Sequence, residues 1–309
     1  MVENRIEISG LSKSFGAVKA LDNISLTLEG SGPFGIVGPD GAGKTTFMRI
    51  LAAVMTFKGK ISVLGAEYPK DSNDAKRFIG YMPQIFGLYK DLSVKENLIF
   101  FAELFGMKKP EVENRMPELL EFSNLTSFVD RPAGKLSGGM KQKLALCACL
   151  IHEPKLLILD EPGAGVDPVS RREFWNIIGK LVQRGIMVVV STTYMDEAQK
   201  CQRVVYLRDG RIHADGTVSD ILSGYPLNLF TFSCQDLHGL KDSIMETGGF
   251  RFVNFFGNEI HASTELRKVE IKEKIAGNLV KRFNDLSWDE INPGLEDVFV
   301  YLGEKVEKG

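Results

Sequence analysis

One glycine-rich segment constrains the fold of this chain more than any other feature of its sequence. Gly38 to Thr45 reads Gly-Pro-Asp-Gly-Ala-Gly-Lys-Thr and fits the pattern G-x-x-x-x-G-K-[ST]. An apolar stretch, Pro33 to Val37, precedes it, and Lys44 to Val54 has helical character. In such a strand–loop–helix, backbone N–H groups converge on phosphate oxygens at the positive end of the helix dipole. The segment therefore predicts a phosphate site in which Lys44 supplies a charge and Thr45 a hydroxyl for Mg²⁺.

A second segment places two acidic residues where such a phosphate site needs them. Leu156 to Leu159 is wholly apolar, as a strand buried on both faces is, and Asp160 and Glu161 follow it. We expect Asp160 to reach the Mg²⁺ shell and Glu161 to polarise the water that attacks a γ-phosphate. Taken alone, the pair would more simply form caps or salt bridges, but a phosphate loop in the same chain favours catalysis.

A third segment, Leu136 to Gln142, offers a second helix end suited to an anion. Ser137 is a natural N-cap, and Gly138 and Gly139 expose backbone N–H groups where a helix begins. The chain then has two helix ends that can bind phosphate, but one triphosphate to bind. This favours a head-to-tail dimer, in which the second helix end of each chain completes the phosphate site of its partner. Standing alone, the segment would be an ordinary capped helix.

The order of the expected elements divides the chain near residue 225. Before it, continuous apolar strands alternate with helices, which is typical of a mostly parallel sheet covered on both faces. After it, we expect strand 228–233, helix 237–247, strand 250–255, strand 259–263, helix 265–283, strand 286–291 and a helix from Pro293. This βαββαβ order predicts a small ferredoxin-like α+β domain over 226–309, following an α/β domain over 1–225.

Composition narrows the class of protein. Lys plus Arg number 38 against 40 for Asp plus Glu, a balance that does not favour a nucleic-acid partner. No apolar run approaches the ~18 residues that a membrane span needs, and no signal peptide is visible. The four cysteines spell no C-x-x-C, and we expect buried thiols in a reducing compartment. We therefore expect a cytoplasmic protein.

In order and spacing, the three segments resemble the ATP-binding subunit of an ATP-binding-cassette (ABC) transporter, over roughly residues 5 to 225. The resemblance implies a P-loop ATPase with an antiparallel β subdomain and a helical subdomain that carries the signature segment Leu136 to Gln142. It implies ATP and Mg²⁺ as cofactors, and a second cassette and a separate transmembrane permease as partners. The subunit would sit on the cytoplasmic face of the membrane.

The resemblance also assigns roles to individual residues of this sequence. Gln84 matches the glutamine that senses Mg²⁺ and the attacking water, Asp167 matches the loop that contacts the other cassette, and Phe15 matches the aromatic stacked on adenine. An isolated Phe15 would otherwise be a core residue, and Asp40 is expected to face solvent because a carboxylate repels phosphate. The implied catalytic residues are Glu161, Gln84 and Thr193, and the implied metal ligands are Thr45, Gln84 and Asp160. The implied nucleotide-binding residues are Phe15, Gly38, Pro39, Asp40, Gly41, Ala42, Gly43, Lys44, Thr45, Thr46, Ser137, Gly138, Gly139 and Asp167.

One position departs from the family pattern. The family normally has a histidine directly after the strand that ends at Thr192, and here the residue is Thr193. The usual contact from that histidine to the γ-phosphate is therefore missing, and we expect this chain's own site to be slow. The second cassette could then be a histidine-bearing partner, although a sluggish homodimer is simpler. A non-catalytic nucleotide sensor is a further alternative.

Two more stretches, Tyr81 to Phe101 and Pro293 to Phe299, resemble drug-exporter-type subunits, so we expect export. Within the first, an apolar cluster lies where the family docks the permease's coupling helix, although its side chains could equally be core: Ile85, Phe86, Leu88 and Tyr89.

A soluble ATPase of the same superfamily is the alternative function. Only 93 residues separate Lys44 from Ser137, which leaves no room for the long coiled coil of DNA-repair members. Translation-type members carry two cassettes in a chain, and this chain carries one.

Overall fold

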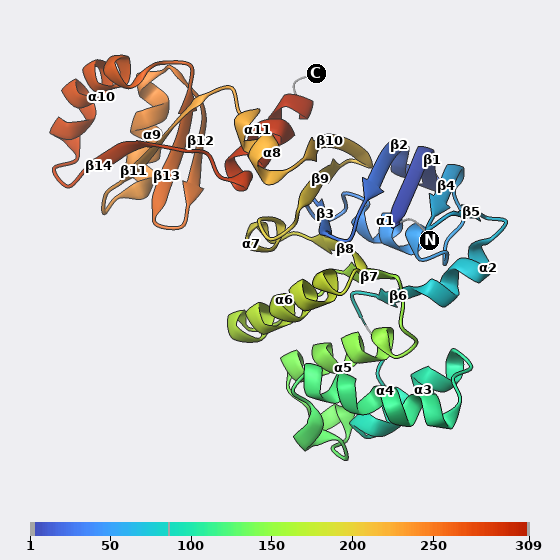
Figure 1. The fold of residues 1–309 in the computed structure, drawn as a ribbon. Helices are drawn as coiled ribbons and strands as arrows, with labels where there is room; N and C mark the ends of the chain where they lie inside the picture. Colours follow the sequence, from blue (N-terminus) through green and yellow to red (C-terminus); the bar gives the residue numbers. More distant parts are fainter. Residues whose placement is uncertain (1–3, 86, 308–309) are drawn as a thin grey trace. The chain divides into compact units, whose positions relative to one another are not determined.

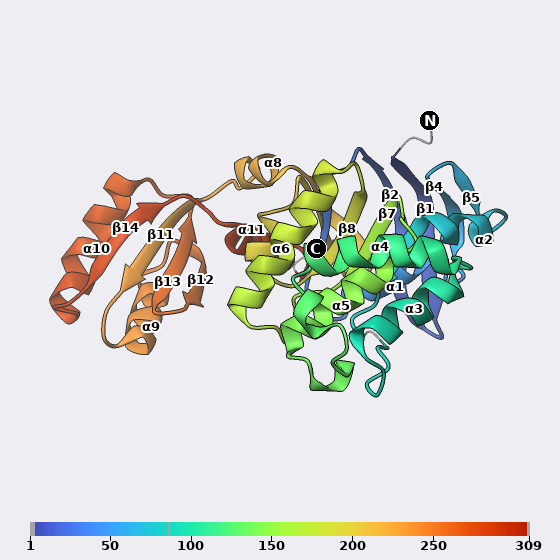
Figure 2. The same cartoon turned by 60° about the horizontal axis from the view of Figure 1, so that its bottom comes forward.

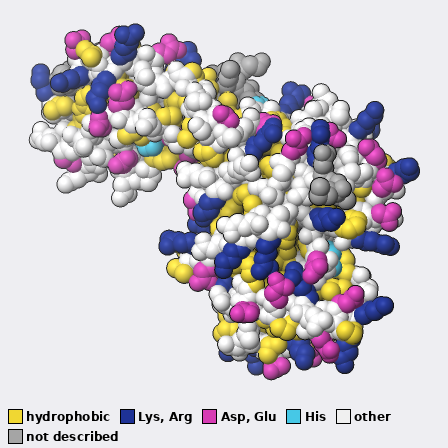
Figure 3. Space-filling model, viewed as in Figure 1, with side chains coloured by type: hydrophobic (Ala, Val, Ile, Leu, Met, Phe, Trp, Pro, Cys, Tyr) yellow, Lys and Arg dark blue, Asp and Glu magenta, His cyan; other side chains and the backbone are white. Residues whose placement is uncertain are grey.

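The computed structural model describes residues 4–85 and 87–307, without the side chains of 274–278 and 304–307. Phe86 of the apolar cluster thus lies outside the described residues. The chain forms two compact units, Met1–Val218 and Ser219–Gly309. Charged side chains of both signs are interspersed on the face of each unit seen in Figure 3, as the balanced composition predicts.

A six-stranded sheet forms the centre of the first unit, in the order β10-β9-β3-β8-β7-β6 (Figure 1). Neighbours from β9 to β6 pair in parallel, and β10 pairs antiparallel to β9. The strands are β3 (Pro33–Val37), β6 (Ile79–Met82), β7 (Leu156–Asp160), β8 (Met187–Thr192), β9 (Arg203–Arg208) and β10 (Arg211–Gly216). Every residue of β7 and β8 is buried, which confirms the mostly parallel, doubly covered sheet predicted from their apolar runs.

A four-stranded antiparallel sheet, β2-β1-β4-β5, packs over the other side of helix α1 (Lys44–Leu51). Its strands are β1 (Arg5–Phe15), β2 (Val18–Glu29), β4 (Lys58–Val63) and β5 (Ala66–Tyr68). The main core lies between the two sheets, where Phe47 and Met48 of α1 meet Ile158 and Val189 of the parallel sheet. Because side chains alternate along a strand, Leu157 and Val188 face the opposite side of the parallel sheet.

The remaining helices of this unit include α6 (Pro168–Gln183), which contacts β3 and β8, and a helical group seen in Figure 2. That group is α3 (Val94–Leu104), α4 (Lys109–Phe122) and α5 (Gly138–Leu150), while α2 (Ser72–Ala75) and α7 (Met195–Ala198) are single turns. A capping box begins α3, with the Ser93 N–H donating to the Glu96 carboxylate at 2.7 Å. Helix α1 stops earlier than predicted because Ala53 adopts a left-handed backbone, with φ of 58°.

The second unit has the predicted βαββαβ order, and its sheet runs β12-β13-β11-β14 with every neighbouring pair antiparallel. Its elements are β11 (Asn228–Ser233), α9 (Leu237–Thr247), β12 (Phe250–Phe256), β13 (Glu259–Thr264), α10 (Lys268–Arg282) and β14 (Ser287–Ile291), flanked by α8 (Val218–Ser223) and α11 (Leu295–Glu307). Phe230, Phe232 and Ile260 on the sheet pack against Leu240 and Ile244 of α9 in a core of their own.

Three of the four cysteines are buried, as expected, and Cys234 is not. Cys147, Cys149 and Cys201 are buried free thiols, and burial raises the pKa of Cys147 to about 11. Cys234 is half-buried instead, because it lies just past the end of β11. Among the described residues, no helix is both long and apolar enough to span a bilayer.

Candidate nucleotide site

The predicted phosphate loop connects β3 to α1, as its sequence context requires. Gly43 caps α1 with φ of 104°, and a Cβ added to it would lie 2.3 Å from the carbonyl oxygen of Ala20. A Cβ added to Gly38 would lie 1.9 Å from the carbonyl oxygen of Leu207. Both positions therefore require glycine, while Asp40 is exposed, as expected.

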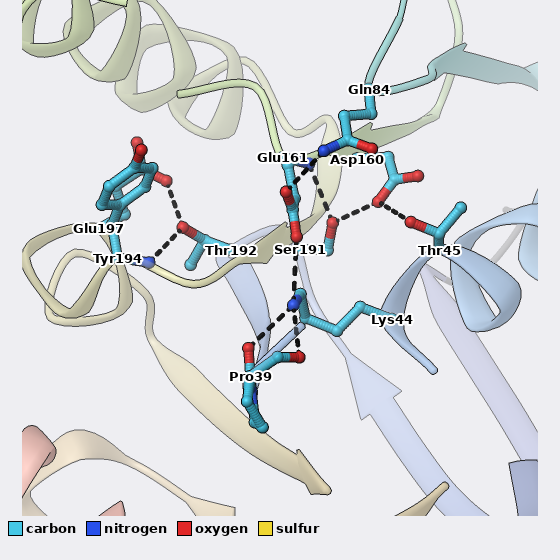
Figure 4. A network of polar contacts seen from close by, with 11 residues as sticks. Pro39, Lys44, Thr45, Gln84, Asp160, Glu161, Ser191, Thr192, Tyr194 and Glu197 are labelled. Carbon is cyan, nitrogen blue, oxygen red and sulfur yellow. Dashed lines mark hydrogen bonds and ion pairs between the residues drawn. The ribbon is translucent and has the colours of Figure 1, made fainter. Parts of the chain in front are cut away.

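The Lys44 ammonium lies inside the curve of this loop. Its Nζ donates to the carbonyl oxygens of Gly38 at 2.8 Å and Pro39 at 2.9 Å, and lies 3.1 Å from Glu161 Oε1 (Figure 4). The Lys44 side chain is 3% exposed and that of Glu161 12%. Folding thus brings together the predicted phosphate lysine and the predicted general base, which the sequence separates widely.

Asp160 ends β7 next to the start of α1. Its Oδ1 accepts hydrogen bonds from Thr45 Oγ1 at 3.2 Å and Ser191 Oγ at 2.6 Å. Its Oδ2 is buried and has no hydrogen-bond partner among the described residues. A buried carboxylate oxygen facing no donor, beside a threonine hydroxyl, is the oxygen chemistry that Mg²⁺ prefers. Thr45 and Asp160 therefore fit the predicted metal.

Glu161, directly after β7, has a left-handed backbone with φ of 49°. Its N–H donates to Ser191 at both Oγ (2.9 Å) and the carbonyl oxygen (3.1 Å). Its carboxylate accepts a hydrogen bond from Gln84 Nε2 at 2.9 Å. Gln84 thus contacts the predicted base directly. Ser191 carries no family motif, and only its place at the carboxyl end of a strand beside β7 could have drawn attention to it.

The turn that carries Thr193 is fixed by its neighbours. Thr192 Oγ1 donates to Glu197 Oε2 at 2.6 Å and accepts from the Tyr194 N–H at 3.0 Å. Glu197 is fully buried, and burial raises the pKa of its carboxyl while the Thr192 hydrogen bond lowers it. Thr193 lies half-buried between these fixed residues.

The signature segment lies against the start of α6, the helix that Asp167 caps. Ser137 Oγ caps α5 by accepting from the Met140 N–H at 3.3 Å, and Asp167 caps α6, with its pKa held low by hydrogen bonds led by that from the Ser170 N–H. A Cβ added to Gly139 would lie 2.4 Å from Ser170 Oγ, so the two helix starts are in close contact. Within residues 4–85 and 87–307, no hydrogen bond or ion pair joins the signature segment or Asp167 to the phosphate loop.

Four other predicted residues are half-buried or exposed. Phe15 ends β1 and is 51% exposed, so the alternative of a core residue is wrong. Thr46 is half-buried in α1 and Gly138 is exposed at the start of α5. Ile85 is 88% exposed, and it likewise is not a core residue.

The chain was compared with known protein families and solved structures. Residues 21–164 match the ABC transporter family model. The chain is 44% identical over 214 residues to the probable multidrug ABC transporter ATP-binding protein YbhF of Escherichia coli (strain K12), covering 68% of this chain but only 37% of that protein. It is 34% identical over 313 residues to the Nod factor export ATP-binding protein I of Rhizobium sp. (strain N33), covering 98% of each.

A solved ATP-binding subunit of an ABC transporter superposes with a TM-score of 0.64 at 29% sequence identity, covering 71% of this chain and 92% of that one. The similarity to the Rhizobium protein covers 98% of both chains, and the family match covers residues 21–164. The resemblance therefore extends well beyond a shared phosphate loop. The chain belongs to the family of ATP-binding subunits of ABC transporters.

Proposed function

We propose that this chain powers export through a separate membrane permease, with ATP-driven closure of two cassettes as the working step. The observation that carries the proposal is the convergence of Lys44, Thr45, Asp160 and Glu161 in one buried site. The names of the relatives, multidrug transport for YbhF and Nod factor export for the Rhizobium protein, support export over import.

The site's residues divide the work of hydrolysis. The γ-phosphate competes with Glu161 and the loop carbonyls for the Lys44 ammonium, and carries more charge than either. Glu161 then accepts a proton from the attacking water, which Gln84 helps to orient through its contact with the same carboxylate. Thr45 and Asp160 would hold Mg²⁺, whose chemistry there would be to neutralise phosphate charge.

Lys44→Ala should weaken ATP binding by roughly 10- to 150-fold, because it deletes a charge-assisted contact worth about 1.5–3 kcal/mol. Calorimetric titration with Mg²⁺–ATP measures this, and transport by the assembled transporter should fall with it. Lys60→Ala is the matched control, since Lys60 is an exposed cation on β4. Wild-type affinity in Lys44→Ala would refute the phosphate-loop assignment.

A head-to-tail pair of cassettes is the second part of the proposal. The helix end at Ser137 and Gly138 is exposed and makes no polar contact with this chain's own phosphate loop among the described residues. The N–H groups at this helix end suit a phosphate of the ATP that is bound to a second cassette. Asp167 caps α6, whose Ser170 lies against the same helix start, and would then lie at that interface.

The permease would dock on the apolar cluster near Gln84. Ile85 is 88% and Tyr89 47% exposed, which is costly for large apolar side chains unless a partner covers them. Because Gln84 contacts Glu161, this surface adjoins the catalytic carboxylate through a single residue. The proposed subunit therefore works at the cytoplasmic face of the membrane.

We also propose that the C-terminal unit is a ferredoxin-like accessory domain that stabilises the dimer or regulates it. Its βαββαβ order and the sheet order β12-β13-β11-β14 support that fold. The domain boundary proposed from the sequence, near residue 225, lies shortly after the division at Val218.

Truncation before Tyr225 should leave a cassette that folds and binds ATP, because the two units have separate apolar cores. Thermal unfolding and ATP titration of residues 1–224 measure this, with the full chain as reference. Loss of the cooperative unfolding transition would mean that the C-terminal unit belongs to the cassette's own core.

A further inference from the structure

A single buried hydroxyl joins the two acidic residues of the site. Ser191 is fully buried at the carboxyl end of β8, and its Oγ donates to Asp160 Oδ1 at 2.6 Å. The same Oγ accepts from the Glu161 N–H at 2.9 Å (Figure 4). A serine hydroxyl has one proton to donate and lone pairs to accept with, so both contacts are compatible.

The first contact orients the Asp160 carboxylate. Ser191 and Thr45 both donate to Oδ1, and the other oxygen, Oδ2, is left buried without a partner. Two donors on one oxygen fix the rotation of the carboxylate plane and keep the second oxygen available for a cation. Without the Ser191 hydroxyl, Oδ1 would lose the shorter of its two hydrogen bonds.

The second contact holds the backbone of Glu161. A non-glycine residue at φ of 49° is disfavoured and persists only when its surroundings fix it. The Glu161 N–H is held by Ser191 through both its hydroxyl and its carbonyl oxygen. This backbone directs the Glu161 side chain between Lys44 and Gln84.

We propose that Ser191 is a positioning residue that sets the metal-facing oxygen of Asp160 and the backbone of Glu161 at the same time. The inference rests on the proposed roles of those two carboxylates. It predicts that one hydroxyl controls both the Mg²⁺ dependence of ATP binding and the rate of hydrolysis, through its contacts with Asp160 and Glu161.

The test compares Ser191→Ala with Ser123→Ala in the full chain. Ser123 is also buried, and its hydroxyl donates to helix carbonyls in α4, away from the site. ATP affinity is titrated with Mg²⁺ and with EDTA, and turnover and the unfolding midpoint are measured. In Ser191→Ala, the gain in affinity from Mg²⁺ and the turnover should each fall about tenfold, with EDTA affinity unchanged. Ser123→Ala should change neither.

Ser191→Cys has a side chain of similar size, but a thiol donates only weakly, so the gain in affinity from Mg²⁺ and the turnover should fall in this variant too. It preserves the test if the alanine variant does not fold. Equal losses with Mg²⁺ and with EDTA would refute the proposal, because they indicate general damage. Wild-type Mg²⁺ dependence and turnover in Ser191→Ala would also refute it, provided that Asp160→Asn loses the Mg²⁺ effect. If Asp160→Asn keeps that effect, the metal role of Asp160 is wrong and the inference falls with it.

Discussion

Glu161→Gln should lower ATP hydrolysis by about 10²–10⁴-fold, the range for loss of a general base, without weakening ATP binding. The glutamine has the same shape, so the left-handed backbone and its hydrogen bonds to Ser191 are retained. It cannot accept a proton from water at neutral pH, however, so the proton-transfer step is slowed.

The contacts of Glu161 also explain why affinity should not fall. In the wild type, Glu161 Oε1 lies 3.1 Å from the Lys44 ammonium, which we propose binds the γ-phosphate of ATP. Glutamine removes the competing charge, and Lys44 becomes easier for the γ-phosphate to recruit. ATP affinity should therefore equal or exceed that of the wild type, and the ATP-bound dimer should accumulate.

Single-turnover hydrolysis, ATP titration and size-exclusion chromatography measure these three outcomes. Glu103→Gln is the matched control, since Glu103 is an exposed carboxylate on α3. Wild-type hydrolysis in Glu161→Gln would remove Glu161 from the role of base. Weaker ATP binding would show instead that the ion pair with Lys44 supports the loop rather than competing with phosphate.

The sequence predicted best those elements whose causes are local. The phosphate loop was predicted from residues adjacent in the sequence: an apolar strand, the G-x-x-x-x-G-K-[ST] pattern and the helix that follows it. The N-cap at Ser137 requires only residues three apart, since its Oγ accepts from the Met140 N–H. Strand β3 was predicted with its bounds, because a short apolar run directly before such a loop has few alternatives.

The sequence could not predict what depends on sheet register. Asp160 pairs with Ser191 across parallel strands that are separated by the whole of α6. Nothing near Ser191 in the sequence indicates that its hydroxyl contacts both the Asp160 carboxylate and the Glu161 backbone N–H. The ion pair between Lys44 and Glu161 has the same origin, since it forms only where β3 and β7 end at the same edge of the sheet.

Position 193 is well suited to a test of the missing histidine. On one side, the Thr192 hydroxyl donates a hydrogen bond to buried Glu197. On the other side, the centre of the Tyr194 ring lies 4.6 Å from the guanidinium carbon of Arg171. The Tyr194 N–H donates back to Thr192 Oγ1, which closes the turn across residue 193. A new side chain at this position would therefore be presented by a rigid turn, with little rearrangement of its neighbours.

Thr193→His should raise turnover in the complete transporter, by up to about 10²–10³-fold if the contact to the γ-phosphate is the limiting feature. A preorganised donor stabilises charge that develops during cleavage, and threonine offers only a short, uncharged hydroxyl. Thr193→Val, which removes that hydroxyl at similar size, shows how much the native residue contributes. Steady-state turnover is measured with the permease and the second cassette present. No increase, despite retained ATP binding and dimer closure, would mean that Thr193 does not limit hydrolysis and that the partner's site sets the rate.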